Sequence, residues 1–255
     1  MPYSEKFKEK STLLFDYDNT LIFFDENEFS KYYFGMIAKK FSDVVEPEKF
    51  VHLLIESTKY VSMGIDADKG TNIERYMNYF FNHIPQLKPK EHLERFKDYY
   101  ENEFALLGKM ANIQPLAKKI IKKAKNKGYK IVIATNPLFP TIGTEVRLQW
   151  GGFSINDFDY VTTGDNSHYA KPLPQYYQEI LNKIGEKPEN CLMIGNDFVN
   201  DGAASIIGIP VFLLKNPQTE NNELDFVLKN AEKILGNQKI NITYEGTLEE
   251  LYDCL

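Results

Sequence analysis

Cysteine, excess positive charge and long hydrophobic runs are all scarce in this sequence, and each scarcity excludes a class of protein. Two cysteines, Cys191 and Cys254, are too few for a disulfide framework or a thiolate metal site. Lysine and arginine number 30 against 36 aspartates and glutamates, so the broad basic surface of a nucleic-acid-binding protein is not expected. No stretch of about 18 apolar residues occurs, and the N-terminal segment contains no apolar signal region. We therefore expect a cytoplasmic protein that binds neither nucleic acid nor membrane.

Five short apolar runs are typical of strands that are buried on both faces of a parallel sheet, because they are continuous rather than alternating. These runs are Thr12–Phe15, Tyr129–Ala134, Tyr160–Thr163, Cys191–Ile194 and Ile209–Leu214. Between the later runs, Leu116–Lys127 and Tyr177–Ile184 have helical spacing and stop before Gly128 and Gly185. The polar stretch Asn216–Glu223 is expected to be a loop. The alternation of strand and helix predicts an α/β fold with a doubly wound, Rossmann-like parallel sheet.

The connection between the first two expected strands is long, at roughly ninety residues, and has helical periodicity throughout. Four helices are expected there, near Phe29, Phe50, Tyr76 and Leu93. A connection of this length with apolar faces of its own folds as a small module. We expect an α/β core formed by residues 1–23 and 109–255 and an inserted helical domain formed by residues 24–108. The aromatic side chains of the insert are interpreted as its own core rather than as a substrate surface.

Two acids follow the first expected strand. In a strand, residues i and i+2 face the same side, so Asp16 and Asp18 would present two carboxylates together. Two negative charges at such a short distance repel each other unless a cation or a shared proton lies between them. Open α/β sheets bind ligands at the carboxyl ends of their strands, where these acids are expected. A turn initiated by side-chain hydrogen bonds is the alternative; it accounts for Asp18 and Asn19 but not for Asp16 directly after an apolar run.

Polar residues also follow the later strands. A hydroxyl followed by free backbone N–H groups can bind an anionic oxygen, and Thr135 and Asn136 could form such a site. A simple Thr-Asn-Pro turn explains the presence of these residues equally well. Lys171 could neutralise a phosphoryl group, and taken alone it would be interpreted as a surface lysine. After the fourth run, Asp197 and Asp201 offer hard oxygens suited to Mg²⁺; the competing interpretation is that Asp201 or Asn200 merely caps the next helix.

Taken in order, these segments resemble the haloacid dehalogenase-like hydrolase superfamily, in its phosphatase branch, over nearly the whole chain. Asp16–Leu21 matches the family's first motif, DxDxT-L, and Thr135-Asn136 matches its second. Lys171-Pro172 matches the third motif, and Gly195–Asp201 matches the fourth. The insert is similar to the family's helical cap of the first type.

The resemblance implies a role for each of these residues. Asp16 would attack phosphorus to give an aspartyl-phosphate, and Asp18 would protonate the leaving oxygen and then activate water. Thr135, the backbone of Asn136 and Lys171 would hold the phosphoryl oxygens and offset their charge. Mg²⁺ would sit on Asp16, the main-chain carbonyl of Asp18 and an acid of the fourth motif.

The fourth motif departs from the family's frequent Gly-Asp, because Gly195 is followed by Asn196 and then Asp197. In the short spacing, Asp197 is the metal ligand and Asp201 supports the site. In the longer spacing, Asn196 replaces an acid and Asp201 matters more. We predict Asp197, since a carboxylate binds Mg²⁺ better than an amide does.

The implied reaction is hydrolysis of a small phosphorylated metabolite, such as a sugar phosphate or a nucleoside monophosphate. A phosphomutase would use the same core residues and remains an alternative. Asp18 argues against dehalogenation, whose enzymes lack the second acid. A phospho-accepting signalling domain is disfavoured, because such domains are shorter and lack the insert, and a silent binding protein is disfavoured because every motif keeps competent residues. The loop Ser62–Gly70, Lys59, Lys69 and Arg75 are interpreted as surface features, and no pattern indicates an oligomeric state.

Overall fold

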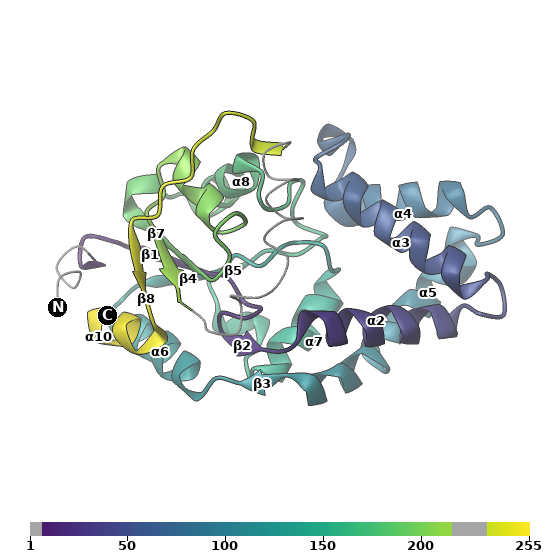
Figure 1. Cartoon of the computed structure of the whole chain (residues 1–255), viewed down its shortest axis with the longest axis horizontal. Helices are drawn as coiled ribbons and strands as arrows, with labels where there is room; N and C mark the ends of the chain where they lie inside the picture. Colours follow the sequence, from purple (N-terminus) through teal and green to yellow (C-terminus); the bar gives the residue numbers. More distant parts are fainter. Residues whose placement is uncertain (1–6, 216–233) are drawn as a thin grey trace.

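The computed structural model describes residues 7–215 and 234–255, in which a parallel sheet with helices on both faces lies beside a group of helices (Figure 1). The sheet has six strands in the order β5-β4-β1-β6-β7-β8, and every neighbouring pair is parallel. The strands are β1 (Thr12–Phe15), β4 (Lys130–Ile133), β5 (Tyr160–Val161), β6 (Cys191–Gly195), β7 (Val211–Leu214) and β8 (Tyr244–Gly246). All five expected strands are present, which confirms the predicted fold class. The loop expected at Asn216–Glu223 lies outside the described residues.

The two faces of the sheet are covered by different helices, which explains why the central strands are apolar at successive positions. Leu13 and Phe15 of β1 belong to the apolar cluster with α6 and α10, whereas Leu14 packs with α8 and η5 on the opposite face. The helices of the sheet domain are α6 (Pro115–Asn126), α7 (Thr141–Trp150), α8 (Pro174–Ile184), α10 (Leu248–Cys254) and the short 3-10 helices η3 (Ile155–Asp157), η4 (Pro188–Asn190) and η5 (Gly202–Ile207). Gly185 ends α8 with a positive φ of 69°, a conformation that glycine adopts without a steric penalty.

The helical insert, defined here as α2 to η2, contains the four helices that the sequence predicts. They are α2 (Glu26–Lys40), α3 (Pro47–Ser62), α4 (Asn72–His83) and α5 (Pro89–Glu101), with the 3-10 helices η1 (Ala67–Lys69) and η2 (Phe104–Met110). Phe41, Phe50, Phe80 and Phe96 form a buried centre, so the interpretation of the aromatic residues as a core holds for these four. The helix expected near Leu93 is α5, although Leu93 itself is 46% exposed because α5 buries Phe96 and its neighbours on another face.

Several contacts join the insert to the sheet domain, including the packing of α7 against α5 and η2. Where the chain enters and leaves the insert, β2 (Ile22–Phe23) and β3 (Asn112–Ile113) pair as a short antiparallel ribbon. At the start of α4, the backbone N–H of Asn72 donates to the carbonyl of Ser167, and its side-chain amide donates to the carbonyl of Pro137. The start of α4 is therefore fixed to loops of the sheet domain.

Arg75 was expected at the surface, and this expectation is wrong, since the side chain is only 3% exposed. Its guanidinium donates to the carbonyls of Ile65, Gly70 and His168, which belong to both the insert and the sheet domain. Burial of a guanidinium is tolerated here because these carbonyls satisfy its donors. Arg75 is thus a structural link between the two parts of the molecule. Within the described ranges, no helix is long and apolar enough to cross a membrane.

Candidate active site

Asp16 lies at the carboxyl end of the central strand β1 and is 9% exposed. Its Oδ1 accepts a hydrogen bond of 2.8 Å from Lys171 Nζ, and its Oδ2 accepts one of 3.1 Å from Thr20 Oγ1. Burial raises the pKa of Asp16 above its ordinary value, although the Lys171 ammonium acts in the opposite direction. The structure therefore positions this carboxylate firmly, with a cation on one oxygen and a hydroxyl on the other.

Lys171 is buried between two carboxylates rather than exposed. Its Nζ lies 2.8 Å from Asp16 Oδ1 and 2.6 Å from Asp201 Oδ1, and its side chain is 2% exposed. Burial alone would lower the pKa of Lys171, but the charges of Asp16 and Asp201 outweigh burial and raise it well above the ordinary value. The lysine is thus a fixed positive charge beside Asp16, as the third motif implies.

Asp18, like Asp16, lies beyond the end of β1, so strand alternation does not describe the two residues. The two acids are close enough that the charge of Asp18 helps to raise the pKa of Asp16. The strand β1 ends at Phe15, so Asp18 lies in the following turn, where Asn19 adopts a positive φ of 56°. Asp18 Oδ2 forms an ion pair with Arg147 of α7, whose side chain is 2% exposed. The two carboxylates are therefore each paired with a different cation instead of sharing one.

Arg147 is a site residue that the sequence analysis missed. It lies 129 positions from Asp18 on a helix behind the second motif, and neither helical periodicity nor motif spacing connects the two. Its Nη2 also lies 3.4 Å from Thr135 Oγ1, and its guanidinium carbon lies 4.8 Å from the centre of the Phe139 ring. Asp18 Oδ1 and Arg147 Nε are buried without a hydrogen-bond partner in the described part of the chain, so each can still bond to water or to a ligand.

Thr135 and Asn136 follow β4, directly beside Asp16 in the sheet. The main-chain carbonyl of Thr135 accepts hydrogen bonds from Thr162 Oγ1 at 2.7 Å and Tyr176 Oη at 2.8 Å, so the backbone is held in place. The backbone N–H of Asn136 makes no hydrogen bond within residues 7–215 and 234–255. A hydroxyl and a free N–H at the end of a strand form the kind of cradle that binds an anionic oxygen.

The fourth motif turns its side chains in different directions. The Asp197 carboxylate accepts hydrogen bonds from the backbone N–H groups of Val199 and Asn200 and from the Asn200 amide, all within its own loop. Asn196 Oδ1 instead lies 3.0 Å from Thr20 Oγ1, the hydroxyl that also contacts Asp16. It is therefore the Asn196 side chain, not that of Asp197, that lies on the side of Asp16.

Asp201 is 1% exposed and accepts from Lys171 on one oxygen and from the backbone N–H of Asp197, at 3.0 Å, on the other. Gly195 makes this approach possible, because a Cβ added at that position would lie 2.0 Å from Asp201 Oδ2. The glycine of the fourth motif is thus required for close packing between β6 and the Asp201 carboxylate.

The motif residues supply oxygens of the chemical type that Mg²⁺ prefers. No group of three or more His, Cys, Asp or Glu side chains within residues 7–215 and 234–255 is arranged to hold a metal by itself. Mg²⁺ usually takes only one or two protein carboxylates and fills its shell with carbonyl, water and phosphate oxygens. Asp16, the main-chain carbonyl of Asp18 and Asn196 Oδ1 are donors of the hard type that this ion prefers.

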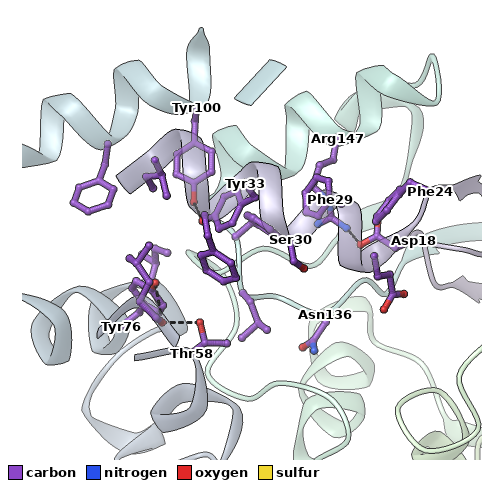
Figure 2. Close-up of a pocket in the computed structure, with 18 of the residues that line it drawn as sticks. Asp18, Phe24, Phe29, Ser30, Tyr33, Thr58, Tyr76, Tyr100, Asn136 and Arg147 are labelled. Carbon is purple, nitrogen blue, oxygen red and sulfur yellow. Dashed lines mark hydrogen bonds and ion pairs between the residues drawn. The ribbon is translucent and has the colours of Figure 1, made fainter. Parts of the chain in front are cut away.

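A pocket of about 360 Å³ adjoins these residues, between the helical insert and the sheet domain (Figure 2). Asp18, Asn136 and Arg147 line one end of it, and side chains of the insert line most of the rest, together with Phe24, Leu138 and Phe139. A sequence model of haloacid dehalogenase-like hydrolases matches residues 10–206, which include every motif described above. The chain belongs to this family.

Proteins of known activity and structure are similar to this haloacid dehalogenase-like hydrolase over most of its length. Glyceraldehyde 3-phosphate phosphatase of Methanothermobacter thermautotrophicus is 29% identical over 222 residues, which cover 86% of this chain and 91% of the relative. Pyrophosphatase PpaX of Bacillus mycoides is 26% identical over 190 residues, which cover 73% of this chain and 75% of the relative. These relatives support a phosphohydrolase.

Solved structures of the family share the fold. A HAD phosphatase of Thermococcus onnurineus superimposes with a TM-score of 0.55 at 19% identity and covers 95% of this chain and 96% of its own. The HAD-hydrolase YfnB of Bacillus subtilis, solved with bound magnesium, gives a TM-score of 0.53 at 19% identity. The match covers 96% of this chain and 97% of the YfnB chain.

Proposed function

We propose that this chain is a Mg²⁺-dependent phosphatase that cleaves a small phosphate monoester through an aspartyl-phosphate on Asp16. The observation that carries the proposal is the position of Asp16, which is held between Lys171 and Thr20 at the end of the central strand. Open α/β sheets bind their ligands at this edge. Lys171, Thr135 and the backbone N–H of Asn136 are suited to hold the phosphoryl oxygens, because they supply a positive charge and donors on three sides.

In the proposed reaction, an oxygen of Asp16 forms a bond to phosphorus while the bond from phosphorus to the leaving oxygen breaks. Asp18 donates a proton to that oxygen, and it then takes a proton from the water that hydrolyses the aspartyl-phosphate. The role of Asp18 is supported by its place at the end of the pocket, with one oxygen held by Arg147 and the other without a partner in the described residues. Arg147 fixes the orientation of this carboxyl group.

Mg²⁺ on Asp16, the Asp18 carbonyl and Asn196 would screen the repulsion between the attacking carboxylate and the phosphate dianion. The longer spacing of the fourth motif, with Asn196 in the place of an acid, is supported by the contact of Asn196 with Thr20. The carboxylate of Asp197 already accepts three hydrogen bonds from its own loop. In this arrangement Asp201 orients Lys171 and contacts no substrate.

The test is release of inorganic phosphate from 4-nitrophenyl phosphate, with Mg²⁺ and then with excess chelator. We expect metal-dependent turnover that is lost in Asp16→Asn and kept in Asp253→Asn, a matched change at an exposed position of α10. Near wild-type turnover by Asp16→Asn would show that Asp16 is not the nucleophile. Transfer of phosphate within a sugar without its release would instead indicate a mutase.

A further inference from the structure

The pocket between the insert and the sheet domain has walls that are mainly apolar and rich in aromatic side chains. Side chains of Phe24, Phe29, Tyr33, Tyr76, Tyr100 and Phe139 line it, and Figure 2 shows several of them around a common space that reaches Asp18. Its volume of about 360 Å³ lies at the lower end of the range of about 300–1,000 Å³ found for small-molecule sites. The pocket therefore has room for one small organic group next to the phosphoryl site.

The hydroxyl groups in these walls are largely bonded to protein atoms. Tyr33 Oη and Tyr100 Oη lie 3.1 Å apart, and Tyr76 Oη and Thr58 Oγ1 both donate to the carbonyl of Leu54. Burial raises the pKa of Tyr33 to about 12 and the pKa values of Tyr76 and Tyr100 well above their ordinary value, so the phenols stay neutral. A hydroxyl-rich ligand would find few free partners on these walls.

Charge is almost absent from the pocket. Among the described residues that line it, the charged ones are Asp18, Glu26 and Arg147, and Arg147 is paired with Asp18. Asn19 Nδ2 donates to Glu26 at 2.7 Å. Neither lysine nor histidine is among these lining residues. A leaving group with a phosphate or carboxylate of its own would thus be buried without a counter-charge, which is strongly unfavourable.

We infer that the substrate of this site is the phosphate monoester of a small, uncharged, apolar alcohol, and that an aromatic ring of the alcohol occupies the pocket. The inference rests on the proposed phosphatase activity and makes it specific. It differs from the sugar phosphates and nucleoside monophosphates that the sequence suggested. It differs also from the substrates named for the two relatives, since glyceraldehyde is hydrophilic and pyrophosphate leaves a charged phosphate.

The experiment compares kcat/KM for 2-phenylethyl phosphate and ethyl phosphate. Both release a primary alcohol, so the ratio measures the ring and not the reactivity of the leaving group. Burial of one aromatic ring predicts a preference of about 10- to 100-fold for the phenylethyl ester. sn-Glycerol 3-phosphate, 3-phosphoglycerate and uridine 5′-monophosphate should be poorer substrates than the phenylethyl ester. Absence of a ring preference, or a preference for any of these three polar esters, would overturn the inference.

Acetyl phosphate separates this inference from the proposed function, because its leaving group is too small to need the pocket. If acetyl phosphate is hydrolysed through Asp16 but no ring preference exists, the leaving-group inference alone is wrong. If no phosphate ester and no acetyl phosphate is hydrolysed in the presence of Mg²⁺, both the proposed function and the inference are wrong.

Variants of the walls provide a second measurement. Tyr33→Ala removes an aromatic side chain of the pocket and should lower the ring preference about tenfold. Tyr32→Ala is the control, since Tyr32 is the next residue of α2, is 50% exposed and does not line the pocket. Met77→Lys, at a partly buried lining position, should lower the ring preference and raise the relative use of 3-phosphoglycerate. An unchanged ring preference in both Tyr33→Ala and Met77→Lys would contradict the assignment of this pocket to the leaving group.

Discussion

Lys171→Met should destabilise the protein to an extent that depends on pH. The ammonium lies between Asp16 and Asp201, at 2.8 and 2.6 Å, and the side chains of Lys171 and Asp201 are 2% and 1% exposed. Burial raises the pKa of Asp201 to about 7, and Lys171 keeps it from rising further. Loss of one partner from a buried ion pair lowers the free energy of unfolding by about 3–5 kcal/mol. In Lys171→Met this loss is smaller when one of the two carboxyl groups keeps a proton and so stays neutral.

The sign of the pH effect follows from this proton. The unfolded chain releases it near pH 4, whereas the folded wild type releases it near pH 7 and the folded variant at a higher pH. Between pH 7 and pH 9 the folded variant holds a proton that the unfolded chain has lost. Its free energy of unfolding should therefore fall, relative to the wild type, by up to about 1.4 kcal/mol per pH unit.

The assay is urea unfolding at pH 7, 8 and 9 in the presence of chelator, so that no divalent cation replaces the ammonium. Lys119→Met is the control, because Lys119 lies at an exposed position of α6 and should show no such trend. An equal loss of stability at pH 7 and pH 9, or a smaller loss at pH 9, would refute the reasoning.

Two further predictions concern the metal and the pair beside it. Asp197→Asn should leave the Mg²⁺ concentration for half-maximal rate close to that of the wild type. Asn196→Asp adds one negative charge to the ligands, so it should tighten Mg²⁺ binding by about tenfold, as measured by calorimetry without substrate. A large increase in the Mg²⁺ requirement of Asp197→Asn would favour Asp197 as the ligand. Arg147→Met should lower the free energy of unfolding by about 2 kcal/mol, a value reduced from that of fully buried pairs because Asp18 is 30% exposed. Arg95→Met, at an exposed pair, should cost less in the same urea titration, and an equal loss in the two variants would contradict the importance of burial.

The positions of the motif residues could be predicted because parallel strands bring their carboxyl ends to one edge. Asp16 and Thr135 lie far apart in the sequence, yet the apolar runs before them identify two strands that prove to be neighbours in the sheet. The burial of Lys171 between Asp16 and Asp201 could not be read from composition alone. It became an expectation only through the order of the motifs.

Other features had no signal in the sequence. The ion pair of Arg147 with Asp18 depends on how α7 packs behind β1, a tertiary relation that no local pattern encodes. Arg75 was misjudged for a similar reason, because the carbonyls that satisfy its guanidinium come from three separate loops or turns. The strands β2, β3 and β8 are two or three residues long, which is too short for a periodic pattern.

The orientation of the fourth motif shows the limit of an argument from ligand strength. Asp197 is the better Mg²⁺ ligand by chemistry, but its carboxylate is directed into its own loop, where three N–H donors bind it. Asn196 is the weaker ligand and faces Asp16 through Thr20. The backbone of the turn decides which side chain reaches the site.

The central claim is that Asp16 becomes phosphorylated during turnover, and trapping of that intermediate tests it most directly. The enzyme would be mixed with substrate and Mg²⁺, quenched in acid within milliseconds, digested and measured by mass spectrometry. We expect the added mass of one phosphoryl group on the peptide that contains Asp16, and its absence from Asp16→Asn and from samples with chelator. Phosphate release at the wild-type rate with no phosphorylated peptide, or with the phosphoryl group on another residue, would show that Asp16 is not the nucleophile.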